Sequence, residues 1–299
     1  MTTYSRGVLL AVTGTFFYGF LGLAIKFSGE SSATVWQIMA GRGLLGILLV
    51  TLIARVFNIR LITGDTKGML LIGLFNFTGS ALITVALTSI PIFEALILWF
   101  LLPAWTTLLA VRFLGERITA VIALCLLMAI GGAVVVLWPE EGAGISGLSW
   151  GHLAGLFSAL SAAVGFICIR RYSGHHPLSH FFHFCVVALV AAGILQLFQD
   201  TPYVPPVMAL SGIAVAGLLG GLGQMMIFAA VKFIPPGAVT VISMGEIIVA
   251  AVGAYFLFNE SVTLAVFCGG GMIIAAAFGI NLYNARRAKM QTEVLMMEE

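Results

Sequence analysis

The chain has 299 residues, of which 61% are hydrophobic and only 9% carry a charged side chain. A soluble globular domain carries roughly 25% charged residues, so this composition indicates a protein whose main solvent is lipid. The formal net charge of +2 is too small for a nucleic-acid-binding surface. We therefore expect a lipid bilayer, and no nucleic acid, among its partners.

Ten apolar runs follow one another along the chain, each close to the about 20 residues that a helix needs to cross a bilayer. They cover residues 7–27, 34–54, 67–88, 92–112, 118–138, 148–169, 179–199, 207–230, 236–258 and 262–283. The links between them are too short for a soluble domain. The sequence thus predicts an all-α integral membrane protein with ten transmembrane helices.

A spaced motif occurs twice. Pro91 is followed 25 residues later by Glu116, and Pro235 is followed at the same spacing by Glu260, so the two copies are 144 residues apart. Each proline separates two apolar runs and disfavours helix in the residue before it, which predicts a turn there. The two glutamates lie at the starts of the fifth and tenth runs, where we expect helix capping rather than function.

The repeat divides the chain into two halves. We expect a first five-helix repeat at 1–143, a second at 144–285 and a cytoplasmic tail at 286–299. An odd number of helices per half inverts the second half relative to the first. With the N-terminus inside, 12 of the 14 Lys and Arg residues fall at cytoplasmic ends. This bias predicts a multi-pass protein of the inner (plasma) membrane with both termini cytoplasmic.

Several short motifs within this frame resemble the drug/metabolite transporter superfamily, in its EamA-type ten-helix branch. They are Arg42 midway along the second run, Pro103 in the fourth, Leu114-Gly115-Glu116-Arg117 and the weaker second copy Phe258-Asn259-Glu260. The resemblance covers nearly the whole chain. It implies export of small metabolites, often amino acids, through a central cavity, and the aromatic amino acid exporters are one neighbouring group.

Two positions depart from that pattern. Asn259 stands where the family usually has glycine, and Ile247 stands where an intramembrane proline is usual. The missing proline predicts a ninth helix that is straighter than the fourth.

Ionisable residues inside a membrane are costly and mark functional or pairing sites. Glu246 lies in almost wholly apolar surroundings, which suits a carboxylate that binds a proton or a substrate amine, or one that pairs with a basic group. Arg42 could bind a substrate carboxylate through two hydrogen bonds, or hold the second helix in place. Their counterparts 144 residues away, Leu102 and Val186, are apolar. Glu94 is expected to be structural.

Uncharged polar and aromatic residues at mid-span complete the candidate substrate-binding set. As a group they would suit an apolar cavity with a few convergent polar groups, although each could instead serve helix packing. They are Tyr18, Gln37, Asn76, Thr78, Trp99, Ser161, Gln224, Phe228 and Ser243. The candidate gating or turn residues are Pro91, Pro103, Glu116, Pro235 and Glu260.

The leading hypothesis is a secondary transporter that exports small metabolites, in the first place amino acids, by alternating access. Glu246 is the candidate for proton coupling, and a carrier without protons stays open. One alternative is a multidrug cation/proton exporter, and another is a membrane enzyme or lipid-binding protein. The chain lacks a His-Glu-x-x-His zinc pattern and a phosphate-binding glycine loop, so we expect no enzyme, no cofactor and no metal.

Overall fold

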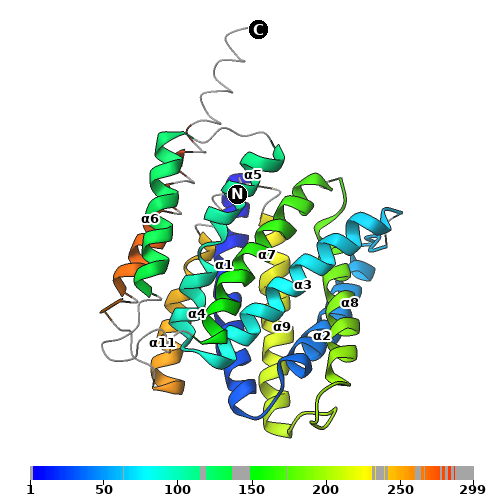
Figure 1. Ribbon diagram of the computed structural model, residues 1–299. Helices are drawn as coiled ribbons and strands as arrows, with labels where there is room; N and C mark the ends of the chain where they lie inside the picture. The colour runs from blue at the N-terminus through cyan, green and yellow to red at the C-terminus, as the bar shows by residue number, and fades with distance from the viewer. Residues whose placement is uncertain are drawn as a thin grey trace, which may run out of the picture.

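The computed structural model describes residues 3–62, 64–114, 119–136, 149–172, 174–230, 233, 239, 242–259, 264–265, 267–276, 278–279, 282–283 and 286. All regular elements in these ranges are helices, so the all-α prediction is confirmed for them (Figure 1). They are α1 (Thr3–Glu30), α2 (Val35–Val56), α3 (Thr66–Ser89), α4 (Ile92–Trp99), α5 (Leu102–Leu114), α6 (Ala120–Val136), α7 (Trp150–Arg171), α8 (Pro177–Gln196), α9 (Val207–Ala230) and α11 (Glu246–Phe258).

Six of the described helices are long and apolar enough to cross a bilayer: α1, α2, α3, α7, α8 and α9. They correspond to the first three predicted runs of each half. Shorter apolar helical segments cover Ile92–Thr106, which contains α4 and the start of α5, Ala120–Gly132 and Phe267–Ala276. The prediction of ten spans is therefore confirmed only in part.

The helices recur along the chain at nearly the spacing of the sequence motif. α1, α2 and α3 are followed in the second half by α7, α8 and α9, and α5 begins at Leu102 while α11 begins at Glu246. The contacts recur in the same way. α1 packs against α9 as α7 packs against α3, α2 packs against α9 as α8 packs against α3, and α2 packs against α8. Exchanging the two halves therefore leaves this contact pattern unchanged.

Glycine allows some of these helices to cross closely. A Cβ atom on Gly223 of α9 would lie 2.8 Å from the carbonyl oxygen of Gly14 in α1. At the equivalent crossing of α3 and α7, a Cβ atom on Gly79 would lie 3.1 Å from the carbonyl oxygen of Ser158. Small residues at such points let two backbones approach within a membrane, and here they lie at matching places in the repeat.

The fourth predicted run, 92–112, is not one helix, and this part of the prediction is wrong. α4 ends at Trp99 and α5 begins at Leu102. In the turn between them, the Leu101 N–H donates to the Leu98 carbonyl at 3.2 Å, three residues back instead of four. Pro103 explains the break, because its ring displaces the carbonyl of Trp99 and it has no N–H to donate.

The same break occurs in the second half without a proline, so the expectation of a straighter ninth helix is also wrong. Residues 244–245 form a turn in which the Gly245 N–H donates to the Ile242 carbonyl at 3.0 Å, and α11 begins at Glu246. Gly245 lies in this turn, and its low helix propensity favours a break there. At the other end of α11, Asn259 adopts the left-handed conformation (φ 53°) that Gly or Asn accepts at a helix C-terminus.

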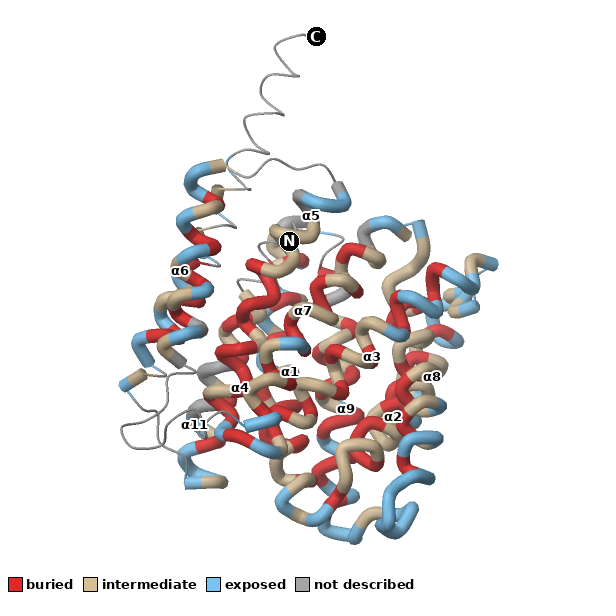
Figure 2. The backbone as a smooth tube through the Cα atoms, in the orientation of Figure 1, coloured by how far each residue is buried: buried red, intermediate tan, exposed pale blue. Residues whose placement is uncertain are grey.

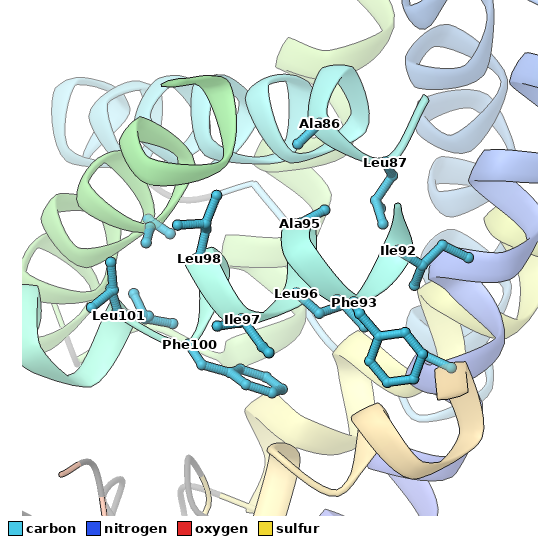
Figure 3. Close-up of a cluster of buried hydrophobic side chains, with 14 of the residues drawn as sticks. Ala86, Leu87, Ile92, Phe93, Ala95, Leu96, Ile97, Leu98, Phe100 and Leu101 are labelled. Carbon is cyan, nitrogen blue, oxygen red and sulfur yellow. The ribbon is translucent and has the colours of Figure 1, made fainter. Parts of the chain in front are cut away.

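Buried residues follow the inward faces of the helices and exposed ones lie at the periphery (Figure 2). The short helix α4 is apolar almost all round and lies inside the largest buried cluster (Figure 3), as a fully buried helix should. By contrast, Leu48 and Leu52 on the outer face of α2 are 59% and 63% exposed. An exposed apolar stripe of this kind is stable in lipid rather than in water.

Candidate functional site

A cavity lies where α1, α2, α3, α4 and the start of α11 meet. We call it cavity A. It contains about 430 Å³ of space between atoms, part of it open to solvent, and only a small fraction of that space is wide enough for a water molecule. Glycines and aliphatic side chains form most of its wall. Its polar and aromatic residues are Tyr18, Arg42, Ser80, Trp99 and Glu246.

Arg42 reaches cavity A from α2. Its Nη1 donates to the Ser80 hydroxyl at 3.1 Å and approaches the Met39 sulfur at 3.5 Å. A guanidinium has five N–H donors, and among the described residues the structure records partners for Nη1 alone. No carboxylate of the described residues lies within the 4.0 Å of an ion pair with Arg42. The side chain therefore retains the capacity to bind an anion through two parallel hydrogen bonds.

Glu246 enters cavity A from the first position of α11. Only 4% of the residue is exposed, and within the described part of the chain no hydrogen bond or ion pair to its side chain is recorded. The N-terminus of a helix stabilises a carboxylate, and the preceding break creates this N-terminus in mid-span. Glu246 and Arg42 thus face the same cavity without forming an ion pair with each other.

A second space, cavity B, lies between α2, α8 and α9. It contains about 240 Å³ of space between atoms, part of it open to solvent and almost none of it wide enough for a water molecule. Its wall includes Arg42, Phe181, Phe184, Cys185, Gly221 and Gln224. Arg42 therefore lines both cavities. The Tyr18 hydroxyl in cavity A donates to Gln224 Oε1 in cavity B at 2.9 Å. This hydrogen bond joins α1 to α9 at the boundary between the two spaces.

The structure brings together five of the predicted substrate-binding residues. Tyr18, Arg42, Trp99 and Glu246 line cavity A, and Gln224 lines cavity B. Their roles in binding stay predictions, but their common location is an observed fact. The spacing of these residues along the chain could not place them together.

Other predicted residues are not among those that line either cavity, and each has a hydrogen-bond partner elsewhere. The Gln37 amide caps the start of α2 and donates to the Pro202 carbonyl at 2.6 Å. Asn76 donates to the carbonyl of Ile72, one turn earlier. Ser161 donates to the Phe75 carbonyl at 3.0 Å and so joins α7 to α3.

The remaining predicted residues are not among the described residues that line either cavity. The Ser243 hydroxyl donates to the Val239 carbonyl at 2.9 Å, and Thr78 is half-buried. Pro91 is the residue before α4 and Pro103 lies in the first turn of α5. The side chain of Phe228 and the residues Glu116, Pro235 and Glu260 lie outside the described residues.

Sequence reasoning missed Ser80, which is the hydroxyl partner of Arg42. Serine within a helix is a weak signal, because its hydroxyl commonly bonds back to its own helix. The repeat gave a stronger signal for Ser80, because Ser80 lies 144 positions before Gln224, which was a predicted substrate-binding residue. Both side chains lie beside Arg42, each on the third helix of its half.

Outside the cavities, Glu94 joins the two halves. Its Oε2 lies 2.8 Å from Nε2 of His152, and the other ring nitrogen of His152 accepts the Ser149 N–H at 3.0 Å. The neutral imidazole then carries its proton on Nε2 and donates it to the carboxylate. This arrangement links α4 to the start of α7, as expected for a structural residue. In the described part of the chain, no three His, Cys, Asp or Glu side chains come close enough to hold one metal ion.

A known protein structure shares this fold over most of the chain. A crystal structure superposes with a TM-score of 0.68 at 17% sequence identity, and the match covers 95% of this chain and 99% of the other. A pseudopaline exporter of Pseudomonas aeruginosa is 28% identical over 279 residues, which is 92% of this chain and 95% of the relative. An S-adenosylmethionine uptake transporter of Rickettsia bellii is 26% identical over 221 residues, 72% of each chain.

The family model of the EamA-like transporters matches the chain twice, at residues 5–138 and 149–282. The two matches begin 144 residues apart, which is the offset of the sequence motif. They show that the molecule is built from two repeats and is a multi-pass membrane protein. Because the matches cover most of its length, the chain belongs to the EamA-like transporter family.

Proposed function

We propose that this protein is a secondary carrier that exports small zwitterionic metabolites, in the first place amino acids. One observation carries the proposal. Arg42 and Glu246 line the same cavity, and neither has a partner of opposite charge among the described residues. A buried charge without a partner is costly, and a ligand with a carboxylate and an ammonium group would compensate both.

The chemistry of cavity A fits such a ligand. The guanidinium of Arg42 would take the carboxylate through its remaining N–H donors, and the carboxylate of Glu246 would accept the ammonium. Trp99 and the aliphatic wall would contact the rest of the molecule. A mostly apolar cavity with a few convergent polar groups is typical of small-molecule sites.

The relatives support an amino-acid-like substrate and leave the direction to experiment. S-adenosylmethionine, for which the Rickettsia bellii relative is named, contains an α-amino acid group. That relative is named for uptake, whereas the Pseudomonas aeruginosa relative, which matches over more of the chain, is named as an exporter. We propose export on the strength of this longer match.

Alternating access is the mechanism we propose. The cavity is too narrow for a substrate in the present state, so transport needs an opening movement. In Figure 1, α1 descends from the N label while α7, its counterpart, rises. This supports two inverted five-helix repeats, at 1–143 and 144–285, in a ten-span arrangement. Such repeats commonly rock about a site at the bilayer midplane. The charge bias supports both termini on the cytoplasmic side of the inner membrane.

The alternative of a multidrug cation exporter fits cavity A less well. A lipophilic cation could pair with Glu246, but the positive charge of Arg42 lines the same space and would repel it. At an effective dielectric constant near 20, two unit charges 4 Å apart interact by about 4 kcal/mol. A zwitterion avoids this cost, because its carboxylate lies at Arg42.

Counterflow in proteoliposomes tests the proposal. Vesicles preloaded with an unlabelled amino acid should accumulate the labelled one, and protein-free vesicles should not. The screen includes cationic dyes as the competing substrate class. Accumulation of dyes without any amino acid would refute the proposal in favour of a cation exporter, and transport of neither class would favour an enzyme or lipid-binding protein.

Proton coupling through Glu246 needs a second measurement. A pH gradient imposed across the vesicles should drive net uptake of the amino acid by the wild type. The Glu246→Gln variant should lose this response, because an amide cannot take up and release a proton. If a pH gradient has no effect on the wild type, the protein is a facilitator and Glu246 serves the substrate ammonium alone.

A further inference from the structure

The short helix α4 has cavity A on one side and α7 on another. It is eight residues long, and a turn at 100–101 follows it. Leu96 and Trp99 line cavity A, whereas Leu98 points away from Leu96 (Figure 3). A Cβ atom built on Gly155 of α7 would lie 3.2 Å from the Cβ of Leu98. One wall of the cavity in the first half therefore rests on a helix of the second half.

A polar pair lies on the same side of α4. Glu94 is one helical turn before Leu98, and its Oε2 lies 2.8 Å from Nε2 of His152 on α7. The side chains of Glu94 and His152 are 20% and 12% exposed, so the pair is shielded from most of the solvent. Separating α4 from α7 has to break this hydrogen bond to a carboxylate.

The repeat places an equivalent contact elsewhere in the molecule. The residues 144 positions from Leu98 and Gly155 are Ile242 and Ala11, and Ile242 packs against the buried cluster that contains Ala11. Because α1 and α7 run in opposite directions (Figure 1), the two contacts lie towards opposite ends of the molecule. We call the packing of Leu98 on Gly155 the outer contact, and that of Ile242 with the cluster of Ala11 the inner contact, after the proposed orientation.

The polar pair has no equivalent at the inner contact. The residues 144 positions from Glu94 and His152 are Ala238 and Val8, which have no polar side-chain atoms. Val8 packs against the same apolar cluster as Ile242. The repeat thus provides two equivalent contacts, and a side-chain hydrogen bond between these positions supports only the outer one.

We propose that Glu94 and His152 form a latch that holds the outer contact closed and makes opening towards the outside the more costly of the two movements. This inference rests on the proposed function, from which it takes the orientation and the opening movement. Opening at the inner contact separates the apolar side chains described above, whereas opening at the outer contact also breaks the bond between Glu94 and His152. The latch then sets how the carrier divides its time between its two open states.

A cysteine at the outer contact reports its opening. Leu98 is fully buried, so the thiol of Leu98→Cys should react with a water-soluble maleimide only while α4 and α7 are apart. Labelling in proteoliposomes is compared with that of the wild type, whose four native cysteines give the background. Adding His152→Gln removes the donor to Glu94 and keeps the cap of α7, because glutamine three residues after Ser149 can complete the same capping box. Adding Glu94→Ala removes the acceptor instead.

Either addition should raise the labelling rate of Leu98→Cys by about two- to tenfold, the range that corresponds to one net hydrogen bond. Both additions together should have no more effect than the larger single one, because they remove the same contact. Ile242→Cys is the matched control at the inner contact, and its labelling rate should not rise when His152→Gln is added.

The latch is overturned if neither addition raises the labelling of Leu98→Cys. An equal rise for Ile242→Cys also overturns it, because the fold as a whole would then be looser, and so does a double variant in which the two effects multiply. Counterflow by the wild type decides the proposed function separately. A wild type that carries no amino acid refutes that function, while the labelling rates still decide whether the pair holds the outer contact closed. Thermal unfolding in detergent checks that the variants are folded.

Discussion

Replacing Arg42 by methionine removes the positive charge from cavity A and keeps a long, flexible side chain. The expected loss can be worked out from the contacts of Arg42. Its Nη1 uses the Ser80 hydroxyl as an acceptor, so the wild-type guanidinium can offer its other N–H donors to a carboxylate. Hydrogen bonds that involve a charged group contribute roughly 1.5–3 kcal/mol each. One such bond is therefore worth about ten- to 150-fold in affinity.

The assay is a cycle in which the protein and the ligand are both changed. Competition with counterflow is measured for an amino acid and for the amine that lacks its carboxyl group. The wild type should prefer the amino acid by about ten- to 150-fold, and Arg42→Met should lose most of this preference. Comparing the two ligands cancels any general damage to folding, which affects both equally.

Ser80→Ala provides a comparison that keeps the charge of Arg42. It removes the acceptor of Nη1, a hydrogen bond between a charged and a neutral group, and should reduce the preference less than Arg42→Met does. The reasoning is refuted if Arg42→Met prefers the amino acid over the amine as strongly as the wild type does. In that case Arg42 would be a structural residue that fixes α2, as the sequence equally allowed.

The remaining predictions concern the crossing of α1 and α9. Tyr18→Phe removes the hydrogen bond to Gln224 and leaves a partly buried amide oxygen without its donor. The variant should have a free energy of unfolding lower by about 1–3 kcal/mol, measured by unfolding in detergent. Its transport rate, measured by counterflow, should also change. Gly223→Ala places a methyl group 2.8 Å from the Gly14 carbonyl oxygen and should lower the free energy of unfolding by about 1–3 kcal/mol. Gly271→Ala is the control, because an added Cβ would meet none of the described residues within 4 Å. This control should unfold at nearly the wild-type temperature. Equal stability of the two glycine variants would contradict the close crossing.

The long helices could be predicted from the sequence because a membrane span needs little more than length and apolar composition. α1, α2 and α3 match predicted runs to within a few residues, and so do their counterparts in the second half. The breaks could not be predicted in the same way, since a turn such as 100–101 lies inside an uninterrupted apolar run. Pro103 indicated the first break as a candidate turn residue, but it did not give the bounds of the two helices. The second lies at Gly245, in a chain with 35 glycines, so a glycine alone did not identify it.

The candidate site was predictable to the extent that it depends on charge. Arg42 and Glu246 stand out in any apolar run, because few other interactions justify an ionisable group there. Neutral polar residues were less informative, as Gln37 illustrates. Its amide completes the capping of α2, for which the spacing from Thr34 to Gln37 is a recognisable signal. It also bonds to the Pro202 carbonyl, a partner that no pattern of spacing revealed. Cavity B was missed entirely, because glycines and phenylalanines are also what ordinary helix packing requires.

The repeat gives a physical reason why Glu246 lies where it does. Both halves interrupt a helix at equivalent points, and the second segment begins at Leu102 in one half and at Glu246 in the other. Each interruption creates a helix N-terminus within the membrane, and unpaired N–H groups there favour a nearby negative charge. Only the second half supplies that charge from its own sequence. In the alternating access that we propose, the two halves have equivalent folds, but only the second half carries a negatively charged side chain at this helix N-terminus. Substrate binding would then be confined to one of two equivalent N-termini, and Arg42, on the other half, would complete it.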